Sequence, residues 1–133
     1  MNDLTIGKVS AAAGITTDTI RYYERCGLVF PNSRSQAGYR LYSTDVMDRL
    51  RFISHAKAAG FSLDDINQLL LLKDDPKETC KSIYAHAQKK RSELDTKIRN
   101  LTEMRDTLSE LLIKCGGEGP LSDCPILDSF DQP

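Results

Sequence analysis

The stretch from about residue 77 to residue 114 contains neither proline nor glycine and has a cysteine at either end, Cys80 and Cys115. Because nothing in it interrupts helical backbone, it predicts one long helix. Alternating steps of four and three residues connect the two cysteines along a single heptad seam, through Tyr84, Ala87, Arg91, Leu94, Ile98, Leu101, Arg105, Leu108 and Leu112. At helical rise the cysteines are about 52 Å apart, too far for one metal ion or one intrachain disulfide.

A second copy of this helix changes the geometry. If two antiparallel copies cross near Lys97 and Ile98, residue 80 of one chain lies opposite residue 115 of the other. The spacing therefore predicts a homodimer with thiol sites completed across the two chains.

Length and charge limit the remaining possibilities. A chain of 133 residues with 40% hydrophobic residues can bury one modest core. Residues 1–60 carry eight Lys and Arg against five Asp and Glu, a net charge of +3, although the whole chain carries −1. A polyanion partner is therefore expected to bind the first half.

The four cysteines raise the question of compartment. The sequence shows no signal peptide and no apolar run long enough to span a membrane, so we expect a reducing cytoplasm, where thiols act as ligands or sensors. It also shows no nucleophile and base pair, acid pair or phosphate loop, so an enzyme is not expected.

The first 25 residues predict two short helices, over 4–13 and 17–25, joined by a turn at Gly14. Thr5 is the expected N-cap of the first helix. In the second, Ile20 and Tyr23 face inward, and five polar or aromatic residues project outward: Thr17, Asp18, Arg21, Tyr22 and Arg25. This arrangement is typical of a helix-turn-helix, although solvated helix charges alone would produce the same spacing.

The segment 31–38 predicts a loop that leads into a short strand over 39–42. In a small hairpin beside the helix pair, Arg34, Tyr39 and Arg40 would contact phosphates. Two scaffold helices follow, one capped by Ser43 or Thr44 and one capped by Ser62. His55 and His86 are assigned surface or packing roles.

Asp74-Asp75-Pro76 ends the fourth helix and marks a hinge. The predicted organisation is therefore mainly α: a winged helix-turn-helix DNA-binding domain over 1–75, a dimerisation helix over 76–115, and a loop with a terminal helix over 116–133. Across the glycine-rich loop, Cys115 and Cys124 can converge on one ion. Each cysteine could instead be a small buried hydrophobe, and this is the interpretation favoured for Cys26.

Several short stretches, in order and over essentially the full length, resemble the metal-responsive members of the MerR family of bacterial transcription regulators. These stretches are Thr5-Ile6-Gly7, Thr19-Ile20-Arg21-Tyr22-Tyr23-Glu24, Gly38-Tyr39-Arg40-Leu41-Tyr42, Gly60-Phe61-Ser62-Leu63, Asp75-Pro76 and the loop from Cys115 to Cys124 that ends in Cys124-Pro125-Ile126-Leu127.

The resemblance implies that Arg21, Tyr22, Tyr39 and Arg40 contact double-stranded promoter DNA, with Thr17 and Asp18 near the groove. It implies a homodimer on a promoter palindrome that activates metal-resistance or efflux genes by bending and untwisting DNA for RNA polymerase.

The resemblance also narrows the metal. Family sensors of +2 ions have a cysteine at the position of Cys80, which the sensors of monovalent ions lack. It implies one ion per site, held by Cys115 and Cys124 of one chain and Cys80 of the other. Zinc sensors add a second cysteine beside Cys115 and a loop histidine, which this chain lacks. Three thiolates favour mercury, cadmium or lead, and zinc remains possible with an oxygen ligand.

Two other hypotheses stay open. The thiols could sense oxidants or electrophiles in a regulator of the same fold. Alternatively, the chain could be a structural coiled-coil module that holds a permanent zinc and binds no specific DNA sequence.

Overall fold

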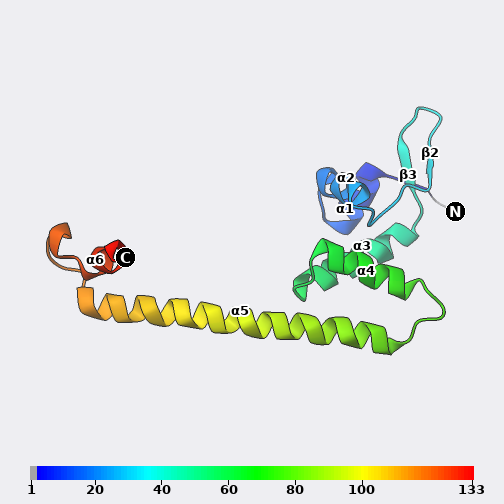
Figure 1. The fold of residues 1–133 in the computed structure, drawn as a ribbon. Coiled ribbons are helices and arrows are strands. Elements are labelled where there is room, and N and C mark those ends of the chain that lie inside the picture. The colour runs from blue at the N-terminus through cyan, green and yellow to red at the C-terminus, as the bar shows by residue number, and fades with distance from the viewer. Residues whose placement is uncertain (1–2) are drawn as a thin grey trace. The chain divides into compact units, whose positions relative to one another are not determined.

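The computed structural model describes residues 3–133 (Figure 1). Those residues divide into two compact units, with the division between Lys90 and Arg91. We call them the N-terminal unit and the C-terminal unit and describe each by itself. The predicted mainly helical fold with a small wing and a long C-terminal helix is confirmed.

The helix-turn-helix opens the N-terminal unit. Helix α1 spans Ile6–Ala13 and α2 spans Thr17–Arg25, the predicted bounds of the second helix. Threonine hydroxyls cap both helices: Thr5 accepts from the N–H of Lys8 at 3.3 Å and Thr16 from that of Thr19 at 3.1 Å. Gly14 turns the chain between the helices with a φ of 72°, a conformation that favours glycine.

The wing is a three-stranded antiparallel sheet with strand order β1-β3-β2. Its strands are β1 (Leu4–Thr5), β2 (Ser33–Arg34) and β3 (Arg40–Tyr42). Thr5 is the N-cap of α1 as predicted, so the helix begins at Ile6. Leu4 and Thr5, which the helical spacing had included, pair instead with Tyr42 and Leu41 of β3. This pairing joins residues far apart in the sequence, so local spacing does not reveal it.

Helices α3 (Asp45–Ala58) and α4 (Leu63–Lys73) support the wing and the helix-turn-helix. Ser62 caps α4 as predicted, in a reciprocal capping box with Asp65. The expected side-chain cap of α3 is absent. Thr44 already has helical backbone angles and its side chain makes no capping hydrogen bond. The carbonyls of Ser43 and Thr44 instead accept from the first N–H groups of the helix.

One hydrophobic core joins α1, α2, the wing and α3 to α4. Its buried members include the two residues predicted to face inward from α2, Ile20 and Tyr23. The others are Val9, Leu28, Val29, Tyr42, Val46, Leu50, Ile53, Ile66 and Leu70. The core fixes α2, the second or recognition helix of the helix-turn-helix, and the wing on one scaffold.

The predicted break after α4 is confirmed. Pro76 and Lys77 form a turn that hydrogen bonds to Asp75 close. The N–H of Lys77 donates to Asp75 Oδ1 at 2.9 Å, and the N–H of Glu78 donates to the Asp75 carbonyl at 3.1 Å. Helix α5 therefore begins at Cys80 and continues to Cys115. Its first turns belong to the N-terminal unit, where Lys90 Nζ lies 3.1 Å from Asp65 Oδ2.

The C-terminal unit contains the rest of α5, a glycine-containing loop, the 3-10 helix η1 (Leu121–Asp123) and the two-turn α6 (Pro125–Asp131). Gly116 and Gly117 both have positive φ, at 65° and 78°, and reverse the chain after α5. Figure 1 shows α6 folded back over the last turn of α5. Among residues 3–133, no helix has the length and apolar character that crossing a membrane requires.

Candidate nucleic-acid interface and metal centre

Residues predicted separately on the recognition helix and the wing lie together in the structure. Arg21 of α2 and Arg34, Tyr39 and Arg40 of the wing line one cavity of about 360 Å³. Three guanidinium groups and an exposed phenol are suited to a phosphate backbone, because arginine donates in a planar fork. Among residues 3–133, none of those that line this cavity is acidic.

The other predicted contacts lie on the outer face of α2. Asp18 is fully accessible and pairs with Arg21, whose Nη1 lies 3.3 Å from Asp18 Oδ1. Tyr22 is 44% exposed, and the guanidinium of Arg25 lies 5.6 Å from the centre of its ring. Thr17, at the start of α2, is partly exposed. These side chains are at least partly exposed and could contact a DNA groove. The ion pair between Arg21 and Asp18 is exposed and therefore weak, so a phosphate could displace Asp18 from Arg21.

Hydrogen bonds within the hairpin hold the wing tip in shape. Arg34 Nη1 donates to the Gly38 carbonyl at 3.0 Å, and the N–H of Tyr39 donates to Ser35 Oγ at 3.1 Å. Tyr39 itself is 70% exposed and lies before β3, not within it. A rigid tip with an exposed aromatic side chain can contact a ligand at little conformational cost.

Sequence reasoning overlooked Glu24. Its carboxylate joins the recognition helix to the wing, with Oε2 3.1 Å from Arg40 Nε and Oε1 accepting from the Tyr42 hydroxyl. The available signal was its position four residues after Ile20, on the face of α2 that packs inward.

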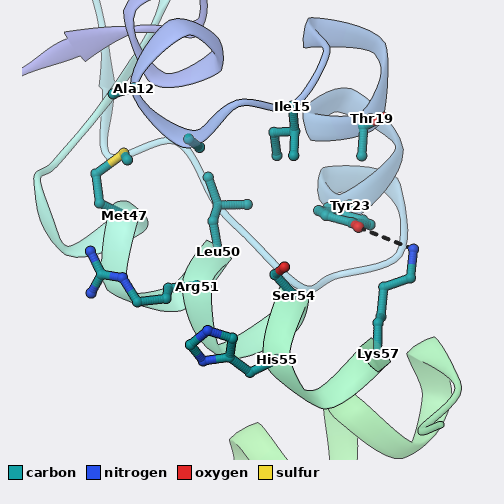
Figure 2. A pocket seen from close by; sticks show the side chains of 11 residues that line it. Ala12, Ile15, Thr19, Tyr23, Met47, Leu50, Arg51, Ser54, His55 and Lys57 are labelled. Atoms are coloured by element: carbon teal, nitrogen blue, oxygen red, sulfur yellow. Dashed lines mark hydrogen bonds between the residues drawn. The ribbon is translucent and has the colours of Figure 1, made fainter. Parts of the chain in front are cut away.

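A second cavity, of about 470 Å³, lies between α1, α2 and α3 (Figure 2). Its floor is apolar, whereas Arg51, His55 and Lys57 of α3 make part of its wall basic. Lys57 Nζ donates to the Tyr23 hydroxyl at 3.4 Å. The described residues that line this cavity include no cysteine, aspartate or glutamate, so its donor set does not suit a soft metal.

The thiols of Cys115 and Cys124 lie close together in the C-terminal unit. Their Sγ atoms are 4.0 Å apart, and both residues are half-buried. Two sulfurs bound to one ion at about 2.3 Å can be separated by at most about 4.6 Å. The pair therefore fits a shared metal ion.

The local backbone favours the thiolate at Cys124, which precedes α6. Its side chain does not form a regular N-cap hydrogen bond, but the first N–H groups of α6 lie near its sulfur. The N–H of Leu127 has the largest effect and lowers the pKa of Cys124, as do the N–H of Ile126 and the Cys115 thiol, while burial and the Asp128 carboxylate oppose them. A thiolate is the form that binds metal.

The remaining cysteines are both in the N-terminal unit. Cys80 is exposed at the first position of α5. Cys26 is also exposed, so its assignment as a buried hydrophobe was wrong. It caps the C-terminus of α2 outside the core and hydrogen-bonds to Tyr22, which raises the pKa of that phenol. Within residues 3–133, no cluster unites three or more Cys, His, Asp or Glu residues.

Comparison with known proteins matches two family profiles. One, described as a MerR HTH family regulatory protein, matches residues 4–73, and another, described as MerR, DNA binding, matches residues 47–111.

Individual proteins match over nearly their whole length. The HTH-type transcriptional regulator HmrR of Rhizobium leguminosarum bv. viciae is 41% identical, covering 97% of this chain and 98% of its own. The mercuric resistance operon regulatory protein of Bacillus cereus is 34% identical, covering 94% and 95%. The solved structure of the transcription regulator PbrR691 from Ralstonia metallidurans CH34, in complex with lead(II), has a TM-score of 0.86 at 31% identity, covering 96% and 98%.

Proposed function

The chain belongs to the MerR family of helix-turn-helix transcriptional regulators, and from that premise we propose that it activates metal-resistance or efflux genes when a soft divalent ion binds. As a member of a family of DNA-binding regulators it is not an enzyme, as the sequence predicted. A regulatory role also argues against a purely structural coiled coil. We propose the cytoplasm as its compartment.

The proposed DNA contacts are Thr17, Asp18, Arg21 and Tyr22 of α2 with Arg34, Tyr39 and Arg40 of the wing. Their support is the cavity that three arginines line together on the N-terminal unit. In a homodimer, two such faces would read the halves of a promoter palindrome.

The proposed metal ligands are Cys115 and Cys124 of one chain and Cys80 of its partner. The 4.0 Å between the Cys115 and Cys124 sulfurs is the single observation that carries this proposal. Cys80 and Cys115 are the first and last residues of α5, so we propose that the partner chain of a homodimer supplies the third thiol. Two relatives support a soft ion, since one is a mercuric resistance operon regulatory protein and the solved structure of the other is a complex with lead(II).

A bound divalent ion would compensate the charge of the thiolates. The proposed response of the chain is closure of the loop between Cys115 and Cys124 on the ion and packing of the terminal helix. The change would be transmitted through α5 and the Asp75-Pro76 hinge to the DNA-binding faces. Deforming promoter DNA costs several kcal/mol, so the metal-bound protein must stabilise the bent form more than the metal-free protein does. RNA polymerase would then use the realigned promoter.

The test combines two measurements on one reduced protein. Mercury, cadmium, lead and zinc are titrated in competition with a chelator while thiolate-to-metal absorption is followed. Promoter transcription by RNA polymerase is measured in parallel at each metal concentration. We expect transcription to rise over the same metal concentrations at which the absorption shows that the thiol site fills. A metal that fills the site and leaves transcription unchanged would contradict the proposed activation.

The same sulfur separation favours one second candidate, a redox-responsive regulator. Two thiols 4.0 Å apart need little movement to form a disulfide. The S–S bond forms as the O–O bond of a peroxide breaks, and the two electrons and two protons of the thiols reduce hydrogen peroxide to two waters or an organic hydroperoxide to an alcohol and one water. This candidate predicts a transcriptional response to peroxide without metal. Response to metal alone would exclude it.

A further inference from the structure

The carboxylate of Glu24 joins two elements that are far apart in the sequence. It lies on α2, and both of its partners, Arg40 and Tyr42, lie on β3 of the wing. The Glu24 side chain is only 12% exposed and that of Arg40 is 39% exposed. An ion pair this sheltered is screened less by solvent than a surface pair.

Both oxygens of this carboxylate are engaged. Oε2 lies 3.1 Å from Arg40 Nε, and Oε1 accepts a hydrogen bond from the Tyr42 hydroxyl. Tyr42 is completely buried in the core, so its ring cannot shift easily. Burial, followed by the neighbouring Glu24, raises the pKa of Tyr42, which keeps its hydroxyl protonated as a donor. The carboxylate is thus held in one orientation.

That orientation determines which part of Arg40 remains for a ligand. A guanidinium has five N–H donors in one plane, and Glu24 engages the one on Nε. The two Nη groups are left for other partners. Arg40 also lines the cavity that contains Arg21 and Arg34, so its Nη groups are available where a phosphate would bind.

We propose that Glu24 is a positioning residue for DNA binding, which locks the wing to the recognition helix and orients Arg40 for a phosphate contact. The inference rests on the proposed function, since it assumes that this face binds promoter DNA. The proposal predicts that loss of the Glu24 charge lowers the affinity for DNA, the opposite of what general electrostatics predicts. Removing a negative charge beside a polyanion should strengthen binding by general electrostatics, whereas loss of positioning should weaken it.

The experiment is a double-mutant cycle on the full-length, reduced, metal-free protein. Glu24→Gln, Arg40→Gln and the double variant are titrated by fluorescence anisotropy with a duplex that the wild-type protein selects from a randomised pool. We expect Glu24→Gln to weaken binding by about tenfold. In the Arg40→Gln background the same change should have almost no effect, because its target is gone.

Two readouts separate positioning from loss of fold or charge. The magnitude of the slope of log affinity against log salt should fall by about 1.8 in Arg40→Gln, because each chain of the proposed homodimer loses one phosphate contact. In Glu24→Gln the slope should move toward the same value. Asp48→Asn is the matched control, because it removes a carboxylate from an exposed ion pair, with Arg51 at 3.0 Å, on the same unit. It should leave affinity unchanged or slightly stronger.

Tyr42→Phe keeps the test valid if Glu24→Gln lowers the melting temperature too far. It removes only the second hydrogen bond and should weaken binding by a few-fold in the same salt-dependent way. If the losses of affinity in the two single variants add up in the double variant, or if Glu24→Gln binds more tightly, the positioning role of Glu24 is overturned while the proposed function stands. If the wild-type protein selects no palindrome, the proposed function fails instead.

Discussion

Replacing Cys124 with serine tests the thiol pair directly. The substitution removes one of two sulfurs that lie 4.0 Å apart and puts in its place a hydroxyl that stays protonated at neutral pH. Structural four-ligand zinc sites bind with about 10–16 kcal/mol, so one ligand contributes about 3 kcal/mol. We therefore expect Cys124→Ser to weaken metal binding by roughly a hundredfold, at 1.4 kcal/mol per tenfold.

The assay is competition between the reduced protein and a chromophoric chelator, with thiolate-to-metal absorption as a second signal. Cys26→Ser is the matched control, because that thiol is also free and exposed but lies on the N-terminal unit beside Tyr22. It should bind metal like the wild type. Melting curves of both metal-free variants establish that neither substitution unfolds the chain.

The outcome can refute the site in two ways. Unchanged affinity in Cys124→Ser would mean that the close sulfur pair does not hold the metal. An equal loss in Cys26→Ser would mean that the thiols act non-specifically or elsewhere in the chain.

Cys80→Ser should lower the metal affinity of the dimer in the same assay. Unchanged affinity would mean that Cys80 is not a ligand and that only Cys115 and Cys124 supply thiolates. Ser62→Ala removes the capping box of α4 and should lower the free energy of unfolding by about 1 kcal/mol in a denaturant titration. The Ser62 backbone N–H, then its hydroxyl and Lys90, lower the pKa of Asp65, so this carboxylate stabilises the fold above its unfolded pKa. That stability is lost as pH falls through the folded pKa, and an Asp65→Asn variant should match the wild type in acid melts. Gly14→Ala should lower the free energy of unfolding by about 1 kcal/mol, because its φ is +72° although the added Cβ meets no atom within 4 Å. Gly7→Ala is the control: Gly7 lies in α1 and its added Cβ is equally free of contacts, so this change should be neutral or slightly stabilising.

Local sequence signals located most helices well. Thr5, Thr16 and Ser62 supply hydroxyls at helix starts, and Gly14 supplies the left-handed residue that the first turn requires. Each of these effects acts within three or four residues, which is why a single sequence reveals it.

The same signals failed where distant segments compete. Leu4 and Thr5 fit a helix by spacing, but pairing with Tyr42 and Leu41 makes them a strand. Thr44 has a capping hydroxyl, yet its backbone is already helical and backbone carbonyls accept the first N–H groups instead. Cys26 resembles a core residue in type, and only its place outside the packed core leaves it exposed.

The long helix and the loop after it show most clearly which features depend on local sequence and which depend on tertiary structure. The absence of proline and glycine determines from the sequence alone that residues between Cys80 and Cys115 form a helix, and the glycines after it determine that the chain reverses. Tertiary structure decided that Cys115 and Cys124 lie 4.0 Å apart, and that Glu24 joins the recognition helix to Arg40 of the wing. Helix formation depends on neighbours along the chain. The spacing of nine residues across a glycine-rich loop indicated that Cys115 and Cys124 can converge, but how the loop closes sets the distance between their sulfurs. How the core packs sets the contact of Glu24 with Arg40, which no spacing indicated.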